Sequence, residues 1–274
     1  MNQSDMGPGG NVPDYGAFPD QSALAGQPRQ EEEARLGPVE RLTGTIFSPG
    51  ETFADINRRP TWLVPMVISI VLALGFSLFF TWRVKPDYEK ITRDQIRRAV
   101  ERSGQPMPPD DQIRAQAAVA KVIGTIAPVV FPPLFLLLLA GIFALGLMVM
   151  SAQTTFKKIL SVVTWSNVAT GLVYILVAVA SLMMRDPSTV DPTQPATIAA
   201  TNLGAFISTE SGALRALLGS IDIFTIWFLI LLSIGFAAIA GSKRFTTGKT
   251  ATLVFGLWAC WLLIRAGIGA AFGQ

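Results

Sequence analysis

The sequence has no histidine, a single cysteine (Cys260) and few charges, which make up 15% of 274 residues. Without histidine, one chain cannot supply an imidazole-dependent catalytic unit or metal site, and one cysteine cannot close a disulfide within the chain. The carboxylates are spread among polar segments and form no spaced pair inside an apolar run, so general acid–base chemistry lacks a site. We therefore predict no catalytic residues, no metal, no cofactor and no enzymatic activity.

Apolar residues, by contrast, make up half of the chain, and the mean hydropathy is +0.45. Water-soluble domains rarely have this composition, so the sequence indicates a membrane protein. The net charge of +3 is dispersed between apolar runs rather than gathered in one patch, and we expect no nucleic-acid partner. The N-terminus lacks the pattern of a cleaved signal peptide, so we expect the first membrane helix to direct insertion.

The N-terminal part divides into a polar tail, predicted to be disordered over residues 1–36, and two short amphipathic helices over residues 38–58 that we expect to lie in the membrane interface. The second of these helices begins a membrane-entry motif, made up of Ser48, Pro49, Glu51, Phe53, Arg58, Arg59 and Trp62. Ser48 is the expected N-cap, Pro49 suits the first helical position, and Glu51 completes a capping box. Phe53 marks the apolar face. The two arginines precede the apolar run, and Trp62 is expected at headgroup depth.

The membrane domain is predicted to cover residues 61–272. Five apolar runs in it are long enough to cross a bilayer, and we predict spans over residues 62–82, 130–150, 159–183, 217–240 and 251–271. Residues 83–118 are predicted to form a polar helical loop, and prolines just before and within the second span predict a kink. The expected fold is an all-α integral membrane protein, a bundle of five transmembrane helices with short interfacial amphipathic helices.

The short loops carry the charges that set orientation. With the N-terminus in the cytoplasm, Arg58-Arg59, Lys157-Lys158 and Lys243-Arg244 all lie inside, and the cation-poor loop 184–215 lies outside. The cation-rich loop 83–118 is an exception. This arrangement places it outside, whereas Lys and Arg residues are enriched in cytoplasmic loops. We predict a cytoplasmic N-terminus and an external C-terminus on the strength of the two short loops.

Three polar residues within the predicted spans are candidate site residues. Asp222 and Arg265 fall at similar depth in the fourth and fifth spans, which are antiparallel, so we predict an intramembrane salt bridge between them. We favour a structural lock over a coupling-ion or substrate site. Asn167 lies early in the third span, where an interhelical hydrogen bond is the ordinary role and a solute site is the alternative.

The pre-membrane stretch Ile46-Phe47-Ser48-Pro49-Gly50-Glu51-Thr52-Phe53, continued by Arg59-Pro60-Thr61-Trp62 and Pro65, precedes five closely grouped spans. In these features the chain resembles the Yip1 domain family over about residues 38–272. The resemblance implies an integral protein of a bacterial inner membrane without assigned catalysis. The Asp-Leu-Tyr-Gly-Pro segment of eukaryotic members is absent, so their Rab GTPase binding is not implied.

Two functions follow as hypotheses. The first is a non-enzymatic membrane scaffold, membrane-organising or partner-binding protein, whose partners are the lipid bilayer and a second copy or other membrane proteins. The second is a small solute transporter or permease component with a site near Asn167, Asp222 and Arg265. Five spans do not divide into equal halves, so a repeat of the kind found in transporters would need a dimer.

Overall fold

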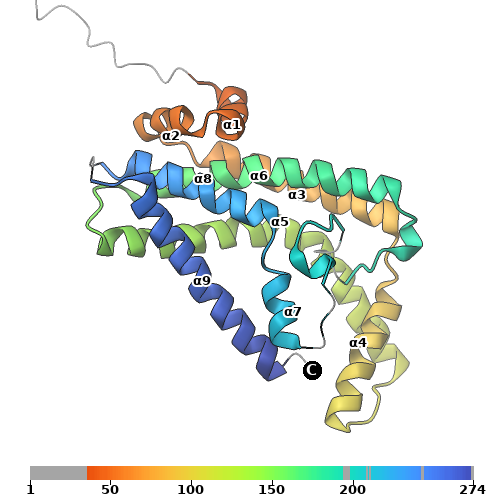
Figure 1. Cartoon of the computed structure of the whole chain (residues 1–274). Coiled ribbons are helices and arrows are strands. Elements are labelled where there is room, and N and C mark those ends of the chain that lie inside the picture. The colour runs from red at the N-terminus through yellow and green to blue at the C-terminus, as the bar shows by residue number, and fades with distance from the viewer. Residues whose placement is uncertain (1–35, 194–197, 208, 210, 242–243, 273–274) are drawn as a thin grey trace, which may run out of the picture. The chain divides into compact units, whose positions relative to one another are not determined.

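The computed structural model describes residues 36–193, 198–207, 209, 211–241 and 244–272; the predicted tail therefore lies outside the described residues except for Leu36. This part of the chain is helical, and the strand-like pairing found in it is an isolated bridge between Asn202 and Asp222. The elements, labelled in Figure 1, are α1 (Pro38–Phe47), α2 (Pro49–Arg58), α3 (Leu63–Val84), α4 (Tyr88–Ser103), α5 (Asp110–Val149), α6 (Phe156–Met184), η1 (Pro187–Thr189), η3 (Leu203–Ala205), α7 (Gly212–Leu218), α8 (Ile223–Ile239) and α9 (Thr247–Phe272).

Four helices of the described chain are long and apolar enough to cross a membrane, over residues Leu63–Val84, Val129–Val149, Phe156–Met184 and Thr247–Ala270. The predicted count of five spans is not confirmed, because α8 has only 17 residues. Its late start has a local cause. The Asp222 carboxylate accepts hydrogen bonds from the backbone N–H groups of Phe224 and Thr225 at 2.8 and 3.3 Å, which makes Asp222 the N-cap. The helix therefore begins six residues later than the predicted span.

The second span belongs to a single helix, α5, which runs for 40 residues through all three of its prolines. Figure 1 shows that α5 changes direction along its length, as expected for a proline-containing helix. Its N-terminal part pairs with α4, and the pair forms the polar helical segment expected between the first two spans. Asp87 caps α4 by accepting from the N–H of Lys90 at 3.0 Å, and Gly104, with a φ of 69°, ends it.

The core is centred on α6 and α8. From Ile159 to Thr170, α6 is buried except at Asn167, and the α8 side chains of Leu231, Leu232 and Phe236 are at most 1% exposed. The rings of Phe143 on α5 and Phe236 lie 4.9 Å apart between their centroids. α3, α5 and α8 each pack against α6, and α9 packs against α8 and α7. These contacts place the polar residues discussed below.

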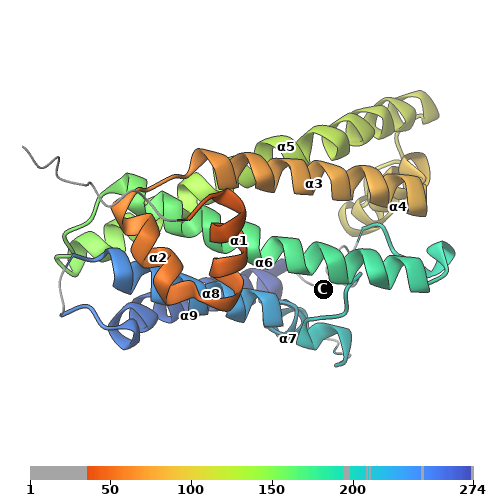
Figure 2. The ribbon, with the colours of Figure 1, turned by 90° about the horizontal axis from the view of Figure 1, so that it is seen from above.

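The two amphipathic helices are present, and Figure 2 shows α1 and α2 lying over α6 and α8. The apolar face of α2 is buried against protein, since Phe53 and Ile56 are both 0% exposed. Ser48 is the N-cap of α2 as predicted, but its side chain makes no capping hydrogen bond, so the predicted capping box is wrong. A carboxylate does reach back at α1 instead, where Glu40 accepts from the N–H of Gly37 at 2.7 Å.

Candidate functional site

A buried ion pair joins α1 to α2. The guanidinium of Arg41 contacts Oδ2 of Asp55 through Nη2 at 2.7 Å and through Nε at 2.9 Å, and the two side chains are only 5% and 9% exposed. Nη1 of Arg41 also donates to Oγ1 of Thr61 at 2.6 Å and to the carbonyl of Arg59 at 3.2 Å. A buried charge is costly unless it is paired and hydrogen-bonded, and here both conditions are met. The ion pair therefore fixes α1 on α2, a hairpin over residues 38–58, and the same guanidinium joins this hairpin to the chain that enters α3.

Two further hydrogen bonds attach the hairpin and the chain that follows it to the membrane helices. Nε1 of Trp165, which is fully buried on α6, donates to the carbonyl of Thr61 at 2.9 Å. Nδ2 of Asn57 donates to the carbonyl of Ala238 at 3.1 Å, near the C-terminal end of α8. A Cβ added at Gly235 of α8 would overlap an α6 side chain, so this close packing of helices requires glycine there.

The residues of the membrane-entry motif fall into two groups. Phe53, which belongs to α2, is buried in the core, and Trp62, directly before α3, packs against the edge of the core. Glu51, Arg58 and Arg59 are exposed. The buried cluster of Arg41, Asp55, Thr61 and Trp165 was not predicted from the sequence. One signal was present, because Thr52, Asp55 and Ile56 have the spacing of a single helical face, which places a carboxylate on the buried side.

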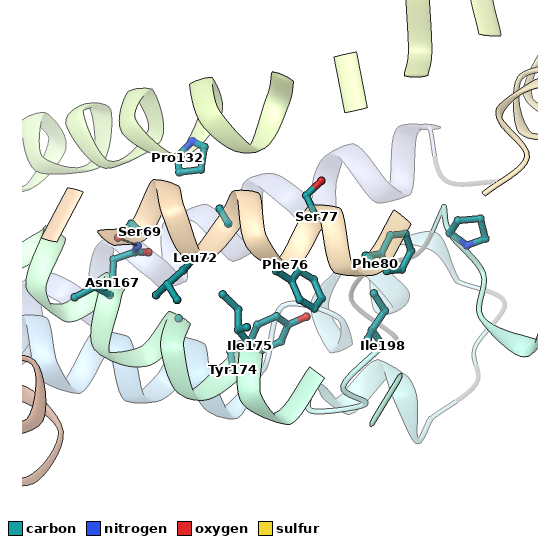
Figure 3. Close-up of a pocket in the computed structure, with 14 residues that line it drawn as sticks. Ser69, Leu72, Phe76, Ser77, Phe80, Pro132, Asn167, Tyr174, Ile175 and Ile198 are labelled. Atoms are coloured by element: carbon teal, nitrogen blue, oxygen red, sulfur yellow. Dashed lines mark hydrogen bonds between the residues drawn. The ribbon is translucent and has the colours of Figure 1, made fainter. Parts of the chain in front are cut away.

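A cavity of about 420 Å³ lies between α3 and α6 (Figure 3). Asn167 lies at one end, where its Nδ2 donates to Oγ of Ser69 on α3 at 3.2 Å. This is an interhelical hydrogen bond of the kind predicted for Asn167. The lining is mostly apolar and is made up of Ser69, Leu72, Ala73, Phe76, Ser77, Phe80, Pro132, Asn167, Val168, Gly171, Tyr174, Ile175, Pro192 and Ile198.

The predicted salt bridge between Asp222 and Arg265 is not among the ion pairs of the described residues. The Asp222 carboxylate is already occupied, since it caps α8 and accepts a hydrogen bond from the hydroxyl of Thr201. Arg265 is exposed on α9. The sequence placed both residues at similar depth, but it could not show that the chain breaks before Asp222 and turns its carboxylate toward the start of α8.

Charged groups outside the spans are held by local contacts. The pKa of Arg93 on α4 is raised by its hydrogen bond to Asp110 and by the charge of that carboxylate, at 2.9 Å. The pKa of Asp186 after α6 is lowered, chiefly because the backbone N–H of Ser188 donates to it at 3.0 Å, and to a smaller extent by the charge of Arg83. Within the described ranges, no group of three or more histidine, cysteine or acidic side chains could hold a metal ion.

Long apolar helices around a mostly apolar, uncharged cavity, with a hairpin fixed at their side, define an α-helical integral membrane protein with several spans. The profile of the Yip1 domain matches residues 43–268, and the chain belongs to this family, as the membrane-entry motif suggested. It is similar to a protein described as "Membrane protein YknW" from Bacillus subtilis (strain 168), with 24% identity over 240 residues, which cover 85% of this chain and 92% of the relative. No solved structure matches the chain.

Proposed function

We propose that this protein is a non-catalytic scaffold of a bacterial inner (cell) membrane that binds other membrane proteins through the α1–α2 hairpin. The observation that carries the proposal is the buried ion pair of Arg41 and Asp55, which fixes α1 on α2 in a hairpin that packs against α6 and α8. A hairpin that only floated on lipid would not need such a pair. Its outer side presents Val39 and Phe47, which are 73% and 81% exposed, and such exposed apolar side chains suit a protein partner.

Photo-crosslinking in intact cells tests the scaffold. A photoreactive amino acid at position 47 is expected to give a discrete protein adduct, because a fixed hairpin presents that position to one partner. The same amino acid at Leu145, a 66% exposed side chain on α5, serves as the lipid-facing control and is expected to give none. Combining the probe at position 47 with Arg41→Ala should remove the adduct. An adduct that survives this substitution, or appears equally at position 145, would contradict the proposal.

We further propose that α8 is a fifth, short crossing, with the N-terminus in the cytoplasm and the C-terminus outside. The cationic pairs at the short loops support this orientation. A Cys260→Ser background with single cysteines at Gly50, Ser188 or Gly248 tests it with an impermeant maleimide. Only position 188 should react in intact cells, and positions 50 and 248 only after permeabilisation. Reaction at position 248 from outside would show that α8 does not cross.

Solute transport is the second candidate, favoured by one observation, the cavity that Asn167 lines. Its test is uptake into proteoliposomes by the wild type and by Asn167→Ala and Asp222→Asn. Under the scaffold proposal, a panel of small solutes enters no faster than into protein-free vesicles, and neither substitution changes the rate. A solute whose uptake requires the protein and falls at least tenfold in Asn167→Ala would instead establish transport.

A further inference from the structure

The cavity between α3 and α6 has the length of one bilayer leaflet. On α3 it extends from Ser69 to Phe80, and on α6 from Asn167 to Ile175. At the rise of an α-helix the α3 side measures about 16 Å. The hydrocarbon core of a bilayer is about 30 Å thick, so one leaflet contributes roughly 15 Å. The cavity therefore runs along the spans over the depth that one layer of lipid chains occupies.

Its width and lining suit a hydrocarbon chain. A volume of about 420 Å³ spread over about 16 Å of helix gives a mean cross-section of roughly 26 Å². Since carbon atoms approach one another to about 4 Å, this admits one chain and not two side by side. No charged side chain is among the lining residues, and the Ser69 hydroxyl already accepts from Asn167. A charged solute would lose its hydration there without gaining a partner.

The two ends of the cavity differ. At the Asn167 end the interhelical hydrogen bond closes the space between α3 and α6. At the other end Ile198 packs beside Phe80, and its carbonyl accepts from Oγ of Ser181 at 2.6 Å, which fixes the loop. Figure 3 shows Phe80 and Ile198 together at this end. The Asn167 end is called the inner end below, and the end at Phe80 and Ile198, near the C-terminus of α3, is called the outer end.

A cation lies just beyond the outer end. Arg83 follows Phe80 by three residues, nearly one helical turn, so both lie on the same side of α3. Its Nη2 donates to the carbonyl of Arg185 at 3.1 Å, and its charge also acts on Asp186. The guanidinium keeps further N–H donors, and a guanidinium recognises phosphate through paired N–H groups. The Arg83 guanidinium therefore offers donors to a lipid phosphate at this end, in competition with the Asp186 carboxylate.

We propose that the cavity binds one acyl chain of a phospholipid from the leaflet at the C-terminal end of α3, with the lipid phosphate at Arg83. The chain lies along Leu72, Phe76 and Ile175, and its methyl end stops near Asn167. The site holds a lipid as a bound constituent of the fold. This lipid binding is a different activity from the partner binding proposed for the α1–α2 hairpin, which packs elsewhere on α6.

Gly171 offers a way to fill the site without disturbing the packing. It lines the cavity, and a Cβ added there meets no atom within 4 Å, so Gly171→Leu would place its side chain in the space of the ligand. Gly75 on α3 is the matched control. It also has open space at its Cβ but does not line the cavity. Gly75→Leu therefore makes the same change in a membrane helix and leaves the cavity open to the lipid chain.

The experiment uses the full chain in nanodiscs that contain phosphatidylglycerol with a diazirine midway along one acyl chain. After illumination, mass spectrometry maps the labelled peptides. The wild type and Gly75→Leu should be labelled on α3 and α6 within the cavity, and unlabelled phosphatidylglycerol should compete. Gly171→Leu should lower this labelling at least fivefold. Ala73→Leu, a second variant that fills the cavity, should do the same and covers the case in which Gly171→Leu fails to fold.

Three results would contradict the proposal. Equal labelling of the cavity in the wild type and in a folded cavity-filling variant would show that no chain enters. Labelling spread evenly over lipid-facing positions such as Leu145 and Met148, with no enrichment in the cavity, would show ordinary contact with bulk lipid. Arg83→Ala should reduce the labelling at least threefold. Full labelling in this variant would show that Arg83 does not bind a lipid phosphate, and the assignment of the ligand to a phospholipid would then be wrong.

Discussion

Breaking the ion pair between Arg41 and Asp55 should open the hairpin by separating α1 from α2. Arg41→Ala leaves the Asp55 carboxylate in a site where it is 9% exposed, without the cation that it faces at 2.7 Å. Removing one partner of a buried pair costs about 3–5 kcal/mol. At 1.4 kcal/mol for each factor of ten, the lower figure increases the population of the open hairpin, in which α1 and α2 have separated, by roughly 150-fold. The whole α1–α2 segment should respond, because the same guanidinium also holds Thr61.

Amide hydrogen exchange of α2 measures this opening in the intact protein. Arg41→Ala should lower protection in α2 by about two orders of magnitude and leave α9 unchanged. The double variant Arg41→Met with Asp55→Leu replaces the pair with apolar groups of similar volume and should restore most of the protection.

The exposed pair of Arg97 and Asp94, 3.7 Å apart on α4, provides the control. Surface pairs contribute less than about 1 kcal/mol, so Arg97→Ala should lower local protection by less than tenfold. If Arg41→Ala affected α2 as little as Arg97→Ala affects α4, the ion pair would not be what holds the hairpin, and the reasoning would be refuted.

Three further substitutions test the packing and the turns. Gly235→Leu should lower thermal stability in detergent by about 1–3 kcal/mol through overpacking against α6, while Gly141→Leu, which has open space, should not. Trp165→Phe keeps the ring buried but loses the N–H bond to Thr61, so about 1 kcal/mol of docking energy should be lost in the exchange assay. Gly104→Ala imposes a Cβ at a φ of 69° and should destabilise the end of α4 by about 1 kcal/mol, measured by its amide exchange.

The membrane helices were largely predictable from the sequence, because long apolar runs have few alternatives. The span predicted at 159–183 lies within α6, and the crossing part of α5 starts one residue before the predicted 130. The helix around the prolines was less predictable. A membrane helix can pass through proline when neighbouring groups satisfy the freed backbone, and hydropathy does not report this.

The hairpin was predictable as structure but not as a site. Periodicity identified the two amphipathic helices, but it could not decide whether Phe53 faces lipid or protein, since both environments are apolar. The pairing of Arg41 with Asp55 depends on how tightly α1 folds back on α2, which is a tertiary property. The same limit explains Asp222, whose role as a cap depends on a break between α7 and α8 that the apolar composition conceals.

The docked hairpin and the short helix α8 are connected physically. Seventeen residues of α-helix extend about 25 Å, less than the roughly 30 Å of a hydrocarbon core. The last four carbonyls of such a helix have no partner within it, and in lipid they would be costly. Ala238 is one of them, and its carbonyl accepts from Asn57 of the hairpin. The hairpin thus supplies to the end of α8 a polar contact that lipid could not provide.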